Sequence, residues 1–240
     1  MQFHIGTSGW VYPHWRERFY PAELPEPEWL SFYAGQLQSV EINRSFYRLP
    51  TRENFLCWHD ATPDGFVFAV KASRYITHMR NLLQPRETLP PLLDAVAALG
   101  DKLGPLLFQL PPRWNANRER LEAFLRVLPR GLQVVFELRN QSWHSEEILA
   151  LLADFNAAFC IYDLGGITSP REITADFLYL RLHGPVDTYR GYYDVATLRR
   201  WARWLREQRV DRAYIYFDND ESAYAVRNAL ELRRLLNRPD

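Results

Sequence analysis

The chain has few cysteines, no net charge and no long apolar run. Its 240 residues include two cysteines, Cys57 and Cys160, which predicts a reducing compartment without a disulfide framework. Lys plus Arg and Asp plus Glu each number 29, so net charge gives no reason to expect binding to nucleic acid or to an anionic membrane. No apolar run approaches the length of a membrane span, and no signal peptide precedes the first strand pattern. We therefore expect a cytoplasmic protein.

Apolar runs of strand length alternate with helical patterns along the chain. The predicted strands cover residues 3–8, 39–43, 66–71, 105–110, 134–139, 158–163, 177–183 and 212–217. The predicted helices cover residues 29–37, 54–60, 87–99, 117–128, 145–155, 195–208 and 223–236. Residues 74–86 have no clear period and are predicted to form a loop, and residues 165–176 contain no convincing helix.

This alternation predicts a parallel sheet with helices packed against it. Eight units in a chain of this size favour an α/β fold, a single (β/α)8 TIM-barrel-like domain over residues 1–240. An open doubly wound sheet is the alternative, and it usually carries a glycine-rich phosphate fingerprint after its first strand. Residues 6–9, Gly-Thr-Ser-Gly, are too weak a match for that fingerprint.

Polar side chains gather where the predicted strands end. In the run 134–139, period-two geometry places Glu137 and Arg139 on one face and the aliphatic residues on the other. The same parity holds in three other runs. Barrel enzymes build their sites at these carboxyl ends. The predicted strand ends supply Glu41, Asn43, Lys71, Gln109, Glu137, Arg139, Asp163, Arg181, His183, Asp218 and Asn219.

Such a ring of charges has two interpretations. Pairs such as Glu137 with Arg139 and Glu41 with Arg181 could close the top of the barrel without any catalysis. A dense ring of charges adds little stability by itself, because a buried ion pair often stabilises a fold no more than apolar residues of the same size would. We therefore favour a functional pocket for the set as a whole.

Four of these residues are the candidate catalytic groups. Glu137, Glu41 and His183 are the best general acids and bases. Two carboxylates from separate strands could also flank a scissile bond, as in glycoside hydrolysis. Lys71 is either a Schiff-base amine or a charge partner.

The remaining candidates would bind a small molecule. Arg139 and Arg181 could hold a carboxylate or phosphate. Glu41, His183 and Asp218 could hold a divalent metal, but no local metal signature is present, so the cofactor stays unknown. The aromatic loop after the first strand could line the mouth or cap the barrel. The candidate substrate-binding residues are Trp10, Tyr12, Asn43, Gln109, Arg139, Asp163, Arg181, Asp218 and Asn219.

Several motifs occur in the order found in one known family. They are Gly6-Thr7-Ser8-Gly9-Trp10, Phe19-Tyr20-Pro21, Val40-Glu41-Ile42-Asn43, Gln109-Leu110-Pro111-Pro112, Glu137-Leu138-Arg139 with Ser142-Trp143, Arg181-Leu182-His183-Gly184 and Tyr216-Phe217-Asp218-Asn219-Asp220. The chain in this respect resembles the YecE-like proteins, a family with a domain of unknown function. The resemblance implies a TIM-barrel-like fold and carries no settled activity. Members of the family often have asparagine where Asp218 stands.

Three hypotheses of function follow. The first is an enzyme that acts on a small polar or anionic molecule, such as a sugar, sugar phosphate or nucleotide, by acid/base hydrolysis or isomerisation. The second is a non-catalytic module that binds a small molecule in the same pocket. The third, disfavoured by the neutral charge, is a nucleic-acid-processing barrel with a basic stripe on its loops. No membrane partner is expected, and a monomer is the default.

Overall fold

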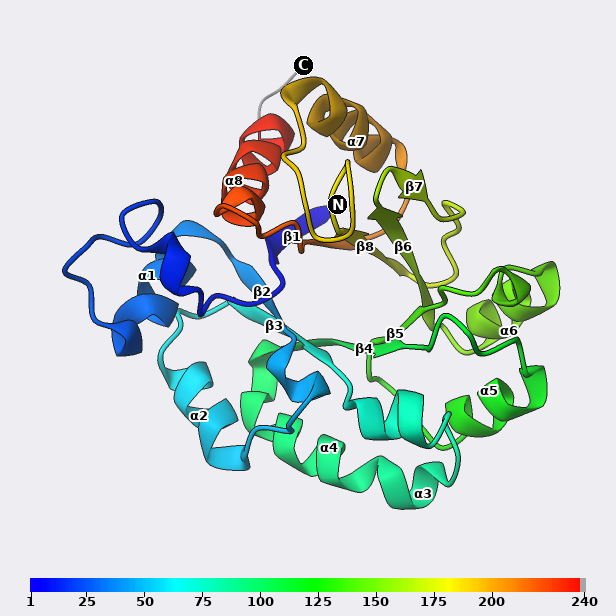
Figure 1. The fold of residues 1–240 in the computed structure, drawn as a ribbon. Coiled ribbons are helices and arrows are strands. Elements are labelled where there is room, and N and C mark those ends of the chain that lie inside the picture. The colour runs from blue at the N-terminus through cyan, green and yellow to red at the C-terminus, as the bar shows by residue number, and fades with distance from the viewer. Residues whose placement is uncertain (238–240) are drawn as a thin grey trace.

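Eight parallel strands form a barrel in the computed structural model, which describes residues 1–237 (Figure 1). The barrel strands are β1 (Gln2–Thr7), β2 (Ser39–Ile42), β3 (Val67–Lys71), β4 (Leu103–Gln109), β5 (Val134–Glu137), β6 (Ala158–Leu164), β8 (Phe177–Leu182) and β9 (Arg212–Phe217). Their order around the ring is β1-β9-β8-β6-β5-β4-β3-β2. The predicted TIM-barrel-like α/β fold is therefore confirmed. The domain limits 1–240 stay a prediction, and residues 238–240 lie outside the described part.

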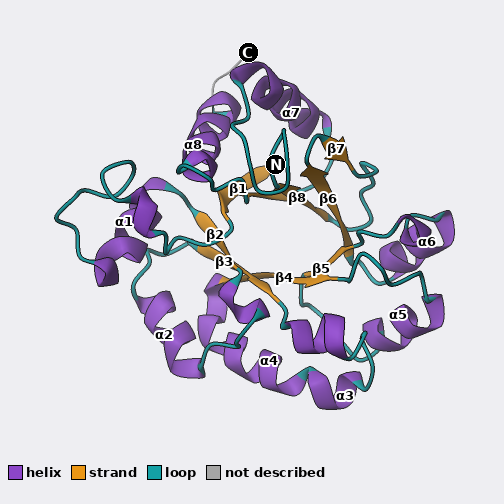
Figure 2. Cartoon of the chain, in the orientation of Figure 1, coloured by secondary structure: helices purple, strands orange, loops and turns teal. Residues whose placement is uncertain are grey.

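Helices surround the ring of strands (Figure 2). They are α1 (Trp29–Gln36), α2 (Arg52–Asp60), α3 (Pro85–Thr88), α4 (Pro90–Val96), α5 (Arg118–Leu125), α6 (Glu146–Asp154), α7 (Val195–Glu207) and α8 (Tyr224–Leu236). Short 3-10 turns lie in several of the loops. Within residues 1–237, no helix combines the length and the apolar character that crossing a membrane requires.

Local sequence explains where a typical outer helix begins and which face it buries. In α7, Leu198, Trp201, Ala202 and Leu205 recur at helical spacing, and all four are buried. The Asp194 side chain caps the helix by accepting a hydrogen bond of 2.6 Å from the backbone N–H of Thr197. The apolar stripe packs inward, and the arginines between its members face solvent.

Two stretches differ from the sequence prediction. Residues 74–86 were predicted as a loop, but they contain a π-helical turn, Tyr75–Met79, followed by α3. The helix predicted over 87–99 is interrupted at Pro90, where α4 starts, because proline has no N–H to continue the preceding helix. Residues 165–176 contain no helix, as expected, but they include the two-residue strand β7 (Ile167–Thr168), which pairs antiparallel with β6.

The barrel strands separate two packed layers. One face of each strand packs against the helices in a large outer core. The other face fills the barrel interior with a smaller cluster, which consists of Ala69, Leu107, Val135, Ala158, Cys160, Phe177, Tyr179, Tyr214 and Tyr216. These residues show which alternate positions of each strand point into the barrel. The next residue of the same parity, two positions further along, therefore also points toward the barrel axis, at the carboxyl end of the strand.

The barrel closes between β1 and β2 through a single parallel bridge, Ser8 with Glu41. The strands approach closely here, because a Cβ on Gly6 would lie 1.9 Å from the carbonyl oxygen of Ser39. The Tyr33 hydroxyl spans the junction: it accepts from the Thr7 backbone N–H at 2.9 Å and donates to the Ser39 carbonyl at 2.9 Å. Closure of the barrel therefore depends on glycine at position 6, which has no side chain, and on the hydroxyl of Tyr33.

The substitution Gly6→Ala should open this junction and lower the free energy of unfolding by at least about 2 kcal/mol, because the new methyl group overlaps rigid backbone. Urea denaturation followed by circular dichroism measures the effect. Gly35→Ala is the matched control: nothing lies within 4 Å of its added Cβ, and alanine in a helix should stabilise by about 0.5–1 kcal/mol. Equal effects of the two changes would contradict this account of closure.

Candidate functional site at the carboxyl end of the barrel

The carboxyl ends of the strands bring charged groups from four strands into direct contact. We call Glu41, Glu137, Arg181, His183 and Asp218 the buried ion cluster. The first four side chains are fully buried, and Asp218 is 17% exposed. They lie near the carboxyl ends of β2, β5, β8 and β9, or directly after them, on the interior parity. Five residues predicted for the site, from four separate strands, thus lie together.

Arg181 lies at the centre of the buried ion cluster. One terminal nitrogen, Nη1, contacts Glu137 Oε2 at 2.5 Å, and Nη2 contacts Glu41 Oε1 at 2.7 Å and Asp218 Oδ2 at 3.2 Å. Glu41 also accepts from the hydroxyls of Ser8 and Tyr179, both at 2.6 Å. The three carboxylates and one guanidinium therefore satisfy most of their hydrogen-bonding capacity within the protein.

Glu137 is shared between two arginines. Its Oε1 accepts from Arg139 Nε at 2.5 Å while Oε2 binds Arg181. Burial alone would raise the pKa of Glu137, but the two guanidiniums together hold it well below its usual range. Glu137 is therefore ionised at neutral pH. A permanently ionised carboxylate is better suited to orienting arginines than to exchanging protons.

His183 is held by the carboxylate of Asp218. Its Nδ1 lies 3.1 Å from Asp218 Oδ2, and its Nε2 lies 3.3 Å from Arg181 Nη1 and 3.5 Å from Arg139 Nη2. Guanidinium groups only donate, so this arrangement fits an imidazole that donates from Nδ1 and offers the Nε2 lone pair. The ring of Tyr189 lies edge-on, with ring centroids 5.5 Å apart.

Above the buried ion cluster lies a ring of donors that we call the donor rim. It consists of Asn43, Lys71, Gln109, Arg139 and Tyr162. All five are buried or half-buried. Within residues 1–237 nothing accepts from the amine of Lys71, the amides of Asn43 and Gln109, the hydroxyl of Tyr162 or Nη1 of Arg139. The side chains that face the mouth are thus mainly unused donors.

Tyr162 is the rim residue that the sequence prediction missed. Strand β6 points Ala158 and Cys160 into the barrel, and Tyr162 continues that parity. The prediction chose the neighbouring Asp163 because it carries a charge. Burial, followed by the charge of Glu137, raises the pKa of Tyr162 to about 12. Counting parity from the small interior residues of the strand would have identified it.

Lys71 is the last residue of β3. Its amine nitrogen lies 4.5 Å from the centroid of the Phe46 ring. Burial and the positive charge of Arg181 lower the pKa of Lys71 to about 8. His78 lies on the following π-helical turn, and burial together with the charges of Lys71 and Arg139 lowers its pKa as well. The positive charges of Lys71 and Arg139 therefore both act on His78 at the rim.

Three predicted substrate-binding residues point elsewhere. Trp10 packs edge-on against Trp58 of α2, in the outer core. The Asp163 carboxylate accepts from the hydroxyls of Tyr193 and Thr168 on the outer side of β6, because its parity is opposite to that of the interior residues. Asn219 is also outside the interior. Its amide donates to the Gly191 carbonyl and to the Asn228 side chain, both within 3 Å.

Tyr12, the other aromatic candidate, reaches the edge of the buried ion cluster. Its hydroxyl donates to the Ser8 carbonyl at 2.5 Å. Burial and the nearby charge of Asp218 raise its pKa. In the loop below, the Trp15 indole donates to Asp220 at 2.8 Å, which anchors the loop to the end of β9.

A divalent metal has no ligand set in the described chain. Nowhere in residues 1–237 do three His, Cys, Asp or Glu side chains converge as a metal ion requires. The proposed combination of Glu41, His183 and Asp218 does not form one, because Glu41 is occupied by two hydroxyls and Arg181.

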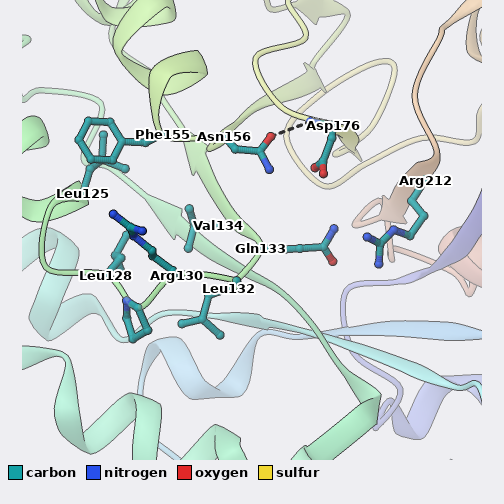
Figure 3. A pocket seen from close by; sticks show the side chains of 12 residues that line it. Leu125, Leu128, Arg130, Leu132, Gln133, Val134, Phe155, Asn156, Asp176 and Arg212 are labelled. Carbon is teal, nitrogen blue, oxygen red and sulfur yellow. Dashed lines mark hydrogen bonds between the residues drawn. The ribbon is translucent and has the colours of Figure 1, made fainter.

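A cavity of about 310 Å³ lies at the opposite, amino-terminal end of the barrel (Figure 3). Leu125, Leu128 and Phe155 line one side together with Arg130, and Asp176 and Arg212 line the other. No residue predicted for the site borders it. Barrel enzymes use the carboxyl face, so this cavity provides a control location for experiments on the donor rim.

The buried ion cluster should make stability fall at acidic pH. The pKa values of Glu137 and Asp218 are lowered in the folded state, so each stabilises the fold above its unfolded pKa and loses this contribution as pH falls through the folded value. We expect the free energy of unfolding to decline below about pH 4.5. Urea titrations from pH 7 to 3 measure this. Glu137→Gln should decline less steeply, and an unchanged slope would exclude Glu137 as a source.

Comparisons with known proteins agree with this architecture. The crystal structure of a DUF72 family protein from Thermotoga maritima superposes with a TM-score of 0.89 and 25% identity, covering 99% of this chain and 100% of that one. A DUF72 family protein from Enterococcus faecalis gives a TM-score of 0.82 at 20% identity, covering 100% of this chain and 97% of that one.

Sequence comparison leads to the same family. UPF0759 protein YunF of Bacillus subtilis is 26% identical over 271 residues, covering 98% of this chain and 94% of that protein. UPF0759 protein YecE of Escherichia coli is 28% identical over 144 residues, covering 60% of this chain and 50% of that protein. The model of the family described as "Protein of unknown function DUF72" matches residues 4–240. The chain therefore belongs to the DUF72 family, which confirms the resemblance to YecE-like proteins.

Proposed function

We propose that this protein is an enzyme that binds a small anionic molecule at the donor rim and acts on it by proton transfer. One observation carries the proposal. The carboxylates at the carboxyl end of the barrel are committed to Arg181 and its neighbours, while the donors above them have no partner in the described chain. An incoming anion would satisfy those donors, whereas the fully buried carboxylates of Glu41 and Glu137 are already engaged by arginines.

The electrostatics of the rim support an anion. Positive charge on Arg181 helps to lower the pKa of Lys71, and positive charge on Lys71 and Arg139 helps to lower the pKa of His78. Burial is the largest cause of both shifts, and carboxylates oppose the shift at Lys71, so the support for an anion comes from the two rim cations, Lys71 and Arg139, which repel a proton at His78. Arg139 keeps part of its guanidinium free to bind a carboxylate or phosphate oxygen. Arg181, predicted as a second clamp, is fully buried, so we assign it the role of holding the acids.

Lys71 is the rim residue best suited to exchange protons. A pKa of about 8 leaves part of the amine unprotonated near neutral pH, so it could accept a proton from a bound substrate. Tyr162 offers a hydroxyl on the same rim. Glu41 and Glu137 lie below, where they fix Arg181 and Arg139 and act as positioning residues.

Inorganic phosphate is the probe that tests the anion site. Isothermal titration calorimetry of the wild type should detect binding, and Arg139→Met should weaken it about 10- to 100-fold, the worth of a charge-assisted hydrogen bond. Arg130→Met, in the cavity at the opposite end, is the matched control and should leave the affinity unchanged. Loss of binding only in Arg130→Met would overturn the proposed location.

A non-catalytic binding module is the second candidate. It is favoured by the burial and full hydrogen bonding of Glu41 and Glu137, which leaves fewer free acids than hydrolysis with paired carboxylates requires. The two candidates differ in turnover. Incubation with a panel of sugar phosphates and nucleotides, followed by phosphorus NMR, should reveal a converted compound if the protein is an enzyme. Tight retention of a panel member without conversion would favour the module.

A further inference from the structure

We propose that Lys71 forms a covalent imine with the carbonyl group of a substrate that also carries a carboxylate or phosphate. This inference rests on the proposed function and names the substrate class: a small aldehyde, ketone or keto acid with an anionic group. The anionic group would bind Arg139, and the carbonyl carbon would lie at the amine.

The position of Lys71 is the first argument. It ends β3 on the interior parity, after Val67 and Ala69, so its side chain rises into the mouth and not into the outer core. Only 8% of the residue is exposed. The ring of Phe46 covers the amine at 4.5 Å, which provides an apolar wall that limits water around it. A partly desolvated amine at a strand end is the arrangement that imine chemistry needs.

The second argument is the lack of a partner. Within the described residues the Lys71 amine makes no hydrogen bond and no ion pair. A lysine that serves structure is engaged, as Lys102 shows: its amine donates to the carbonyl oxygens of His59 and Thr62, both at 2.6 Å. Lys71 thus has burial without the hydrogen bonds and ion pairs that usually offset the cost of burial, and its contact is with the ring of Phe46.

Composition supplies the third argument. Of the 29 Lys and Arg residues in the chain, only Lys71 and Lys102 are lysines. Arginine serves almost every other cationic position. Arginine stays protonated and cannot become a neutral amine, so a lysine at the rim supplies chemistry that arginine cannot. The depressed pKa of Lys71, about 8, agrees with this role.

The covalent step balances without an added oxidant or reductant. The neutral amine attacks the carbonyl carbon and forms a C–N bond, and a proton moves from nitrogen to the carbonyl oxygen to give a carbinolamine. One further proton, from solvent or the Tyr162 hydroxyl, lets the C–O bond break. Water leaves, and a protonated imine remains. Its positive charge would draw electrons from the adjacent carbon and make a proton on that carbon easier to remove.

Reductive trapping tests the inference. The wild-type protein is incubated with pyruvate and sodium cyanoborohydride, and peptides are mapped by mass spectrometry. We expect one carboxyethyl group on Lys71. Lys71→Arg should remove the modification, whereas Lys102→Arg, the matched control, should leave it in place. Arg139→Met should reduce labelling by pyruvate about 10-fold or more while labelling by acetone, which has no anionic group, changes little.

The outcomes separate this inference from the proposed function. Labelling confined to Lys102 or to the N-terminal amine would overturn the imine. If phosphate binds through Arg139 and pyruvate never labels Lys71, the anion site stands and the imine fails. If Lys71 is labelled by pyruvate and acetone at equal rates in wild type and Arg139→Met, the amine is reactive but the anionic substrate class is wrong.

Discussion

Replacing Arg181 with methionine should lower the free energy of unfolding by about 3–5 kcal/mol, because the buried Glu41 would lose its arginine partner and the buried Glu137 one of its two arginines. Glu41 would keep only its two hydroxyl donors, and Glu137 would keep Arg139. The unbranched methionine side chain occupies much of the space of the arginine side chain. The loss of stability would therefore come from the missing charge and not from a cavity. Urea denaturation at pH 7 measures the change.

An exposed arginine provides the control for this prediction. Arg126 forms an ion pair with Glu122 on α5, and its side chain is 65% exposed. Arg126→Met should therefore change the free energy of unfolding by less than about 1 kcal/mol. A second measurement separates charge from packing: at pH 4 the deficit of Arg181→Met should shrink, because the unpaired carboxyls can take up protons. A deficit below about 1 kcal/mol at pH 7 would mean that Arg181 does not hold the cluster together.

The amine of Lys71 should titrate near pH 8 in the folded protein. Burial is the main cause, and the charge of Arg181 adds to it, while Glu137, Glu41 and Asp218 oppose the shift. At pH 7 the unprotonated fraction is then about one in ten, about 300 times the fraction for a lysine at its usual pKa. This is the largest change in reactivity that we expect for any side chain of the site.

Competitive labelling with trace acetic anhydride measures that titration. The rate of acetylation of the Lys71 peptide, followed by mass spectrometry from pH 6 to 11, should rise with a midpoint near 8. The same residue in the urea-unfolded chain is the control and should titrate near its usual value, about 10.4. A midpoint at or above 10 in the folded protein would remove Lys71 as a base and as an imine-forming amine.

Strand parity made the central part of the site predictable. In parallel strands every second side chain points to the same face, and all carboxyl ends of a barrel meet at one rim. Glu41, Glu137, Arg181 and His183 each lie on the interior parity of a recognisable apolar run, so the sequence alone predicted that they converge. Lys71 follows from the same rule.

The same reasoning failed where charge was given more weight than parity. Asp163 and Asn219 were chosen because they are polar and follow a strand, yet they lie outside the barrel interior. Tyr162, one position earlier than Asp163, has the interior parity, but it carries no charge and the prediction did not include it. Trp10 depends on how its loop folds back on α2, which no local period encodes.

By itself, the sequence determined the α/β barrel and which charged strand-end residues converge at its centre, because both follow from short-range periodicity repeated eight times. Only the tertiary structure decided which rim groups are engaged and which are free. Arg181 and Lys71 are equivalent in sequence terms, each a cation that follows apolar residues at a strand end. One lies at 2.5–3.2 Å from three carboxylates and the other has none within ion-pair distance in residues 1–237. That difference depends on distances between strands far apart in the chain, which the pattern of any single strand does not contain.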